Sequence, residues 1–128
     1  MVELETQGVK ISVVTKFKGT NYRGNKLFHF FSYFITIKNN SNDTVQLTHR
    51  HWEIFDSLNK NEIVEGEGVV GNTPILSPDE EYSYTSGCSL ESNLGSMKGF
   101  YVMKNLDNNL SFKVYVPQFQ LIAPILSN

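Results

Sequence analysis

The sequence predicts an all-β domain in which two antiparallel sheets pack as a sandwich. Three observations support this fold class. Apolar residues recur at every second position in several segments, as they do in strands with one buried face. Turn-forming residues separate these segments at short intervals, and no segment keeps the 3.6-residue period of a helix. With 128 residues, 40% of them hydrophobic, the chain has the size and apolar content of a single domain over residues 1–128.

The first predicted strand covers residues 9–17, where four apolar residues share one face: Val9, Ile11, Val13 and Phe17. A loop is expected over residues 18–26. The second strand covers residues 30–37. Its odd positions are apolar and its even positions are partly so, which predicts that both of its faces are covered. The run Asn-Asn-Ser-Asn at 39–42 then predicts a turn.

The segment 44–56 changes its apolar parity. Its odd positions are apolar up to Leu47, and its even positions are apolar from Trp52 onward. A β-bulge between Thr48 and His51 would insert the extra residue that this change requires. A strand that passes from one sheet to the other would explain the pattern equally well.

Four further strands are expected from shorter signals. They lie at residues 62–64, around Tyr82 and Tyr84, at 100–103 and at 112–116, with an extended tail over 117–124. Loops are expected at 66–78 and 92–98, and a turn at 107–109. Seven strands at such short spacing are typical of an immunoglobulin-like sandwich, and a small barrel is the alternative.

Composition excludes several functional classes. The single cysteine, Cys88, cannot form an intrachain disulfide, which suits a reducing compartment and predicts a cytoplasmic protein. Three scattered histidines and a single cysteine argue against a structural zinc site. No apolar run approaches the length of a membrane span, and the net charge of −2 argues against nonspecific nucleic-acid binding.

Charge is unevenly distributed along the chain. Residues 53–91 hold nine acidic residues and one lysine, whereas residues 1–52 hold seven basic and three acidic residues. An acidic middle segment suits a basic partner or a cation, and a solvated surface of strands and loops is the simpler interpretation.

The sequence Gly-Glu-Gly-Val-Val-Gly at 66–71 has the spacing of a dinucleotide-binding loop. Such a loop opens a helix whose amides hold the phosphates, but Pro74 and Pro78 disfavour a helix here. A nest of backbone amides could still bind phosphate, although Glu65 and Glu67 would repel it. The simpler interpretation is that the glycines permit tight backbone turns.

A second group of candidates lies in the segment with the parity change. His49 and His51 are two residues apart and would share a face of a regular strand, which suits transition-metal binding, unless the expected bulge separates them. Arg50 is expected to pair with a carboxylate, and Trp52 is most often a core residue in such a sandwich. The candidate binding residues are therefore Gly66, Glu67, Gly68, Gly71, Arg50, His51 and Trp52.

Catalysis has little support in the sequence. The run 86–89 offers two serine hydroxyls and the thiol of Cys88, but no base and orienting group stand near them in sequence. The run also lacks the Gly-x-Ser-x-Gly pattern of a nucleophile elbow. We therefore expect no catalytic residues, no cofactor and no resident metal.

Several short motifs along the chain resemble the ApaG domain family in their order and spacing. They are Arg50-His51-Trp52-x-Ile54 with Asp56, Gly66 to Gly71 with Pro74, Leu76 and Pro78, Tyr84-Thr85-Ser86-Gly87 with Leu90, Gly95-x-Met97-x-Gly99-x-Tyr101-x-Met103, Pro117-x-Phe119-x-Leu121, and the strand Tyr33-x-Ile35-x-Ile37. The sequence departs from the family pattern at Ser92-Asn93, where Thr-Pro is usual, and at Asn108, where a turn glycine is usual.

The resemblance implies a seven-stranded sandwich like fibronectin type III, which in bacteria is often a free-standing protein. It also implies a non-enzymatic protein-interaction module, with a link to cobalt and magnesium tolerance. The partner would then be another protein, with no nucleic acid or membrane involved. The alternative hypothesis is a binding protein for a phosphate-containing molecule or a divalent cation, acting through the glycine-rich loop. A hydrolase of phosphoanhydrides is a third hypothesis.

Overall fold

The computed structural model describes residues 1–124, which form nine strands and no helix. In chain order these are β1 (Val2–Thr6), β2 (Val9–Arg23), β3 (Lys26–Asn39), β4 (Val45–Asp56), β5 (Glu62–Glu67), β6 (Ile75–Leu76), β7 (Glu81–Leu90), β8 (Leu94–Asn105) and β9 (Ser111–Ile122). Within this part of the chain there is accordingly no helix long and apolar enough to cross a membrane.

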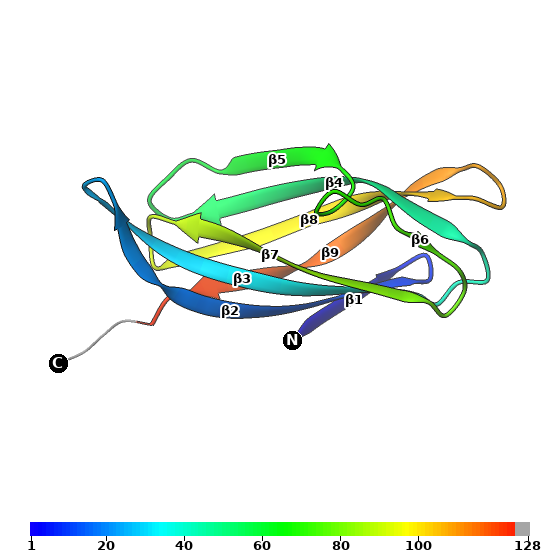
Figure 1. The fold of residues 1–128 in the computed structure, drawn as a ribbon, viewed down its shortest axis with the longest axis horizontal. Helices are drawn as coiled ribbons and strands as arrows, with labels where there is room; N and C mark the ends of the chain where they lie inside the picture. The colour runs from blue at the N-terminus through cyan, green and yellow to red at the C-terminus, as the bar shows by residue number, and fades with distance from the viewer. Residues whose placement is uncertain (125–128) are drawn as a thin grey trace.

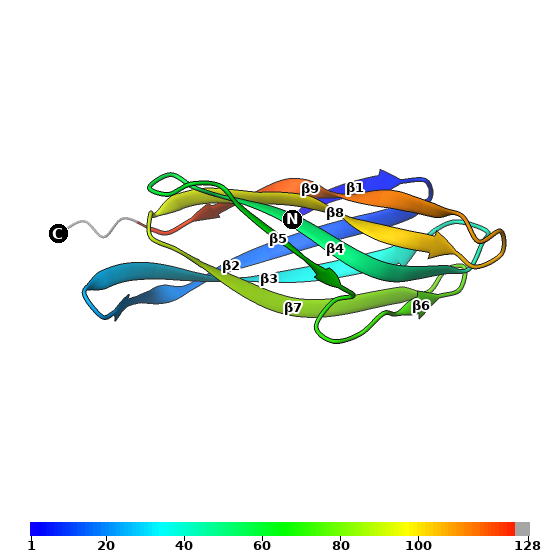
Figure 2. The ribbon, with the colours of Figure 1, turned by 90° about the horizontal axis from the view of Figure 1, so that it is seen from above.

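The strands form two antiparallel sheets that pack face to face (Figures 1 and 2). One sheet has the order β1-β2-β3-β7, and the other has the order β5-β4-β8-β9, with β6 added beside β4. The predicted sandwich is therefore confirmed, and the barrel alternative is wrong. All seven predicted strands are present, and the structure adds β1 and β6.

Three predicted loops are shorter than expected. The segment 18–26 continues β2 and β3 as a long hairpin that turns at Gly24 and extends beyond the sandwich at one end (Figure 2). The segment 92–98 is mostly the start of β8, because Leu94 already pairs with Ile122. The segment 66–78 contains the end of β5 and the two residues of β6.

The outer face of β3 is not covered, contrary to expectation. Phe34 stands between Val14 and Thr85 on this face and is 45% exposed. The inner face of the same strand is buried, as the alternation predicts: Phe31, Tyr33, Ile35 and Ile37 all belong to the core. The aromatic content of the even positions therefore marks an exposed surface and not a second core.

The parity change in β4 is a β-bulge. The pairing of β4 with β8 shifts register between Leu47 and His49, so that Thr48 is the extra residue. Val45 and Leu47 before the bulge and Trp52 after it consequently all reach the core. The other explanation, a strand that changes sheets, is wrong, because all of β4 pairs within one sheet.

An aromatic cluster fills the middle of the core. The ring of Trp52 packs against Tyr33, Tyr101 and Phe119, with ring centroids 5.5, 6.2 and 6.0 Å away. The hydroxyls of Tyr84 and Tyr101 lie 2.5 Å apart, which links the two sheets through a buried hydrogen bond. Trp52 is only 4% exposed, so its prediction as a core residue is confirmed.

Candidate functional site

The bulge at Thr48 decides which face of the sheet each residue of β4 reaches. Beyond it, Trp52 is buried between the sheets, so Arg50 two residues earlier also points inward. His49 and His51 point to the outer face. The candidate residues Arg50, His51 and Trp52 therefore do not form one site, since His51 lies on the opposite side of the sheet.

The glycine-rich segment is the end of β5 followed by a tight turn. Gly68 has φ = +63° and Gly71 has φ = +78°, and Val69 and Asn72 pair across the turn. A Cβ atom on Gly68 would lie 2.1 Å from the carbonyl oxygen of Asn72. The geometry thus supports the structural interpretation of these glycines, because side chains would be strained or obstructed there.

The same geometry disfavours a phosphate nest in this turn. The amide of Gly68 donates to the carbonyl of Thr48, and the amides of Val69 and Asn72 donate to each other's carbonyls. The chain continues into β6 and not into a helix, so no helix dipole faces the turn. Several of the donors that a phosphate would need are already engaged.

Arg50 binds the backbone of this turn from the inner face of the sheet. Its Nη1 donates hydrogen bonds to the carbonyl oxygens of Glu67 and Gly68, both at 3.0 Å. Its guanidinium lies flat under β5, since a Cβ on Gly66 would come within 2.6 to 2.8 Å of its atoms. Among the described residues no carboxylate lies within ion-pairing distance of Arg50, so the predicted pairing with a carboxylate is wrong.

Arg50 lies beside a groove of about 490 Å³ between the two sheets. The groove opens between β5 and β7, which are edge strands of different sheets. It is lined by Tyr33, Arg50, Trp52, Ile54, Glu62, Val64, Val69, Val70, Tyr84, Ser86, Gly87, Cys88, Ser89 and Met97. Of the predicted binding residues, only Arg50 and Trp52 line this groove. The sequence feature that places both on the inner face is that they occupy even positions of β4 after the parity change.

Cys88 lies in this groove but is not an activated nucleophile. Burial, with a smaller effect of the negative charge of Glu62, raises the pKa of its thiol to about 11. The thiol is therefore protonated at neutral pH, and the thiolate is the reactive form. This supports the expectation that the run 86–89 is not catalytic.

His51 belongs to a polar and aromatic row on the outer face. Its Nδ1 lies 2.9 Å from a carboxylate oxygen of Glu65, and its Nε2 lies 3.6 Å from one of Glu53. The imidazole ring of His51 stacks on the ring of Phe100, with centroids 4.6 Å apart. The ammonium group of Lys113 lies over the Phe100 ring. Residues 1–124 contain no group of three His, Cys, Asp or Glu residues arranged to hold a metal ion.

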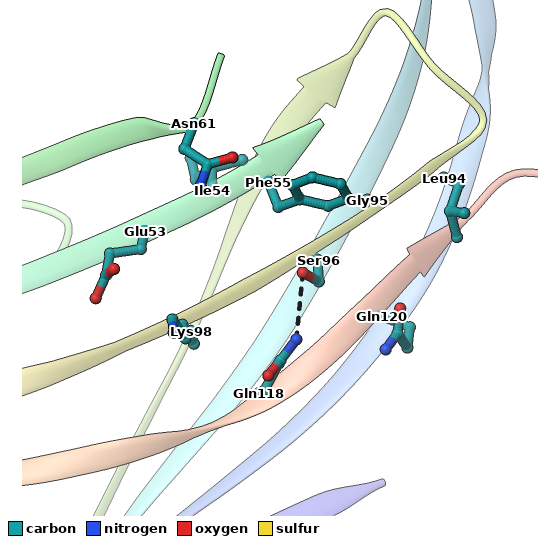
Figure 3. Close-up of a pocket in the computed structure, with 10 residues that line it drawn as sticks. All are labelled: Glu53, Ile54, Phe55, Asn61, Leu94, Gly95, Ser96, Lys98, Gln118 and Gln120. Carbon is teal, nitrogen blue, oxygen red and sulfur yellow. Dashed lines mark hydrogen bonds between the residues drawn. The ribbon is translucent and has the colours of Figure 1, made fainter. Parts of the chain in front are cut away.

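A second hollow lies further along the outer face of the five-stranded sheet. Figure 3 shows its side chains, which come from β4, β8 and β9 and, for Asn61, from the turn before β5; Gln118 donates a hydrogen bond to Ser96 there. The hollow has a volume of about 380 Å³ and is lined by Glu53, Ile54, Phe55, Asn61, Leu94, Gly95, Ser96, Lys98, Gln118 and Gln120. None of these residues is among the seven candidate binding residues, although four of them lie in the segment 92–98, whose expected length as a loop makes it a candidate recognition surface.

Comparison with known proteins identifies the family. The model of the ApaG domain matches residues 20–105, which include Arg50, Trp52 and the whole glycine-rich turn. The chain belongs to the ApaG family. It is 40% identical to Protein ApaG of Methylobacterium sp. (strain 4-46) over 124 residues, covering 97% of this chain and 95% of that protein. It is 39% identical to Protein ApaG of Vibrio atlanticus over 127 residues, covering 99% of this chain and all of that protein.

Solved structures agree with this ApaG assignment. A crystal structure from Bordetella pertussis that carries the name ApaA superposes with a TM-score of 0.80 at 30% identity, covering 97% of this chain and 98% of that one. A second solved structure, a structural genomics target, gives a TM-score of 0.86 at 34% identity, covering 94% and 90%. The family resemblance seen in the sequence is thereby confirmed, and so is the sandwich fold.

Proposed function

We propose that this ApaG chain is a non-enzymatic protein-interaction module. The observation that carries the proposal is an apolar patch around the hollow of Figure 3. We define the outer-face patch as Phe55, Ile63, Leu94 and Ile122, which are 43%, 62%, 45% and 59% exposed. Contiguous exposed apolar surface on a soluble domain is typical of an interaction site.

The outer-face patch is continuous because of strand register. Leu94 pairs with Ile122 across β8 and β9, and Ser96, two residues from Leu94, pairs with Phe55 of β4. Ile63 of β5 pairs with Glu53, which is two residues from Phe55 on the same face. Four strands therefore contribute one apolar residue each to the same end of the sheet.

Polar residues lie between the apolar ones. Glu53, Lys98, Gln118 and Gln120 line the hollow and offer hydrogen-bonding groups beside the apolar side chains. Apolar anchors combined with polar hydrogen-bonding groups are usual in a protein–protein interface. In this proposal the module works in the cytoplasm without a cofactor, and any link to cobalt or magnesium tolerance runs through its protein partner.

Paired variants with matched exposure test the proposal. Phe34, on the outer face of the other sheet, is 45% exposed and serves as the control for Phe55. We expect a partner captured from cells by the unmodified chain to bind Phe34→Ser equally and Phe55→Ser at least tenfold more weakly, as isothermal titration of the purified pair would measure.

Two outcomes would contradict this assignment of the surface. Equal affinity of all three chains would mean that the outer-face patch is not the binding surface. A weakened Phe34→Ser with an unaffected Phe55→Ser would move the interface to the four-stranded sheet. Far-UV circular dichroism of each variant checks that the fold is retained.

A further inference from the structure

The groove between β5 and β7 lies on the other side of the sheet from the outer-face patch, and its chemistry is different. We propose that this groove binds a small molecule with one carboxylate or phosphate group on an apolar body, and that Arg50 binds the anionic group. The two strands are the edges of different sheets, so the groove opens directly to solvent. The proposal is independent of the protein-interaction function.

Arg50 brings a positive charge into this groove that no carboxylate of the described residues neutralises within ion-pairing distance. A guanidinium has five N–H donors in one plane, and the contacts to Glu67 and Gly68 use only Nη1. These two carbonyls fix the plane of the guanidinium before any ligand arrives. A preoriented guanidinium with remaining donors suits two-point binding of a carboxylate or phosphate.

The opposite wall adds hydroxyl groups. Tyr33 and Tyr84 line the groove from the four-stranded sheet, together with Ser86. Burial raises the pKa of both tyrosines, and the nearby positive charge of Arg50 opposes that rise, so the guanidinium and the phenols are neighbours across the groove. Both hydroxyl groups therefore remain protonated at neutral pH; that of Tyr84 is engaged with Tyr101, and that of Tyr33 is the one offered to an anion held by Arg50.

The floor and sides of the groove are apolar. Trp52 and Met97 come from the core, and Val64 and Val69 come from β5 and the glycine-rich turn. A volume of about 490 Å³ is in the range of small-molecule sites. An aromatic or aliphatic group attached to the anion would bury its surface here.

The far end of the groove selects against a second negative charge. Glu62 lines this end and pairs with Ile54, four residues along β4 from Arg50, which places it about 13 Å away at 3.3 Å per residue. Cys88, whose pKa the charge of Glu62 helps to raise, lines the same groove. A polyphosphate would extend toward Glu62, so a ligand with a single anionic group fits better than a nucleotide triphosphate.

Trp52 makes the groove directly observable, because it is the only tryptophan of the chain. Phenyl phosphate and phenylacetate serve as anionic probes, benzyl alcohol as the neutral analogue, and ATP as the polyanion. We expect saturable changes in tryptophan fluorescence with the two anionic probes, and binding at least tenfold weaker for benzyl alcohol and ATP. The absence of a saturable change with both anions, or equal binding of benzyl alcohol, would overturn the proposal.

Variants assign the effect to Arg50. Arg50→Gln should weaken phenyl phosphate binding about tenfold or more, as expected for the loss of a charge-assisted pair. Lys16→Gln removes an exposed positive charge from the outer face of the four-stranded sheet and should leave the affinity unchanged. Equal weakening by both variants, or none by Arg50→Gln, would show that Arg50 is not the anion-binding residue.

The unmodified chain provides a second measurement if Arg50→Gln does not fold. Cys88 is the only cysteine and lines the groove, so its alkylation by excess iodoacetamide at alkaline pH, where part of the thiol is ionised, reports on access to the site. Saturating phenyl phosphate should slow alkylation at least fivefold, and benzyl alcohol at the same concentration should not. Alkylation rates that are unaffected by phenyl phosphate would contradict binding in the groove.

Discussion

Gly68 and Gly71 stand in the same turn but have different surroundings. Both have positive φ, so any other residue would be strained at either position. Only Gly68 is also obstructed, because its Cβ would meet the carbonyl oxygen of Asn72 at 2.1 Å, whereas nothing lies within 4 Å of a Cβ on Gly71. The two glycines are therefore needed for different reasons: Gly71 permits a positive φ, and Gly68 permits a positive φ and also leaves room for the carbonyl of Asn72.

We expect Gly71→Ala to lower the free energy of unfolding by about 1 kcal/mol, which is the cost of a left-handed backbone alone. Gly68→Ala should cost about 3 kcal/mol, because the turn must also move away from Asn72. Urea unfolding of the two variants measures both values. Equal losses would show that backbone strain, and not the close contact, explains Gly68.

At the scale of the elements, the bulge in β4 determines which side chains reach the groove. Thr48 is the extra residue, and its carbonyl accepts a hydrogen bond from Gly68 while its hydroxyl donates to the carbonyl of Val102. Without it, a continuous β4 would turn either its first or its second half to the wrong face. Either Leu47 or Trp52 would then leave the core.

We expect deletion of Thr48 to cost more than about 4 kcal/mol, which is a large part of the roughly 5–15 kcal/mol by which a single domain is stable. Deletion of Lys60, an exposed residue in the turn between β4 and β5, is the control and should be tolerated. Thermal unfolding followed by circular dichroism compares the two. A cooperative transition at the unmodified temperature for the Thr48 deletion would contradict the role of the bulge.

The same element explains what the sequence reveals and what it hides. The parity change in β4 was visible because both halves carry large apolar residues that must be buried. β1 was not visible as a strand, because Val2 and Leu4 lie on a largely exposed edge beside β2. The outer-face patch was hidden for another reason: Phe55, Ile63, Leu94 and Ile122 meet only through strand pairing, which no single segment encodes.

At the scale of the whole molecule, the acidic middle of the chain is gathered on one side. Residues 53–91 form the end of β4 together with β5, β6 and β7, which include both edge strands of the groove. Arg50 lies beside these strands, but none of their described carboxylates is within ion-pairing distance of it. The acidic middle segment therefore occupies neighbouring strands of the fold as well as one stretch of the sequence.

The buried tyrosines predict how the stability of the whole domain depends on pH. Burial raises the pKa of Tyr33, Tyr84 and Tyr101 above the ordinary value of 10.0. In the unfolded chain these phenols ionise near pH 10, while the folded chain keeps their protons. The unfolded state then binds fewer protons than the folded state, so stability is fully present below pH 10 and is lost as the pH rises above it.

We expect the free energy of unfolding to fall by about 1 kcal/mol for each of Tyr84 and Tyr101 between pH 10 and pH 11, and Tyr33 to add to the loss in the same direction. Urea unfolding at pH 9, 10 and 11 measures this loss. Tyr84→Phe is the control: it starts from a lower stability, because it leaves the hydroxyl of Tyr101 without its partner, and it should lose about 1 kcal/mol less over the same interval. A stability that stays constant from pH 9 to pH 11 would mean that these phenols are not protected by the core, and so would contradict the packing of Tyr84 against Tyr101 between the two sheets.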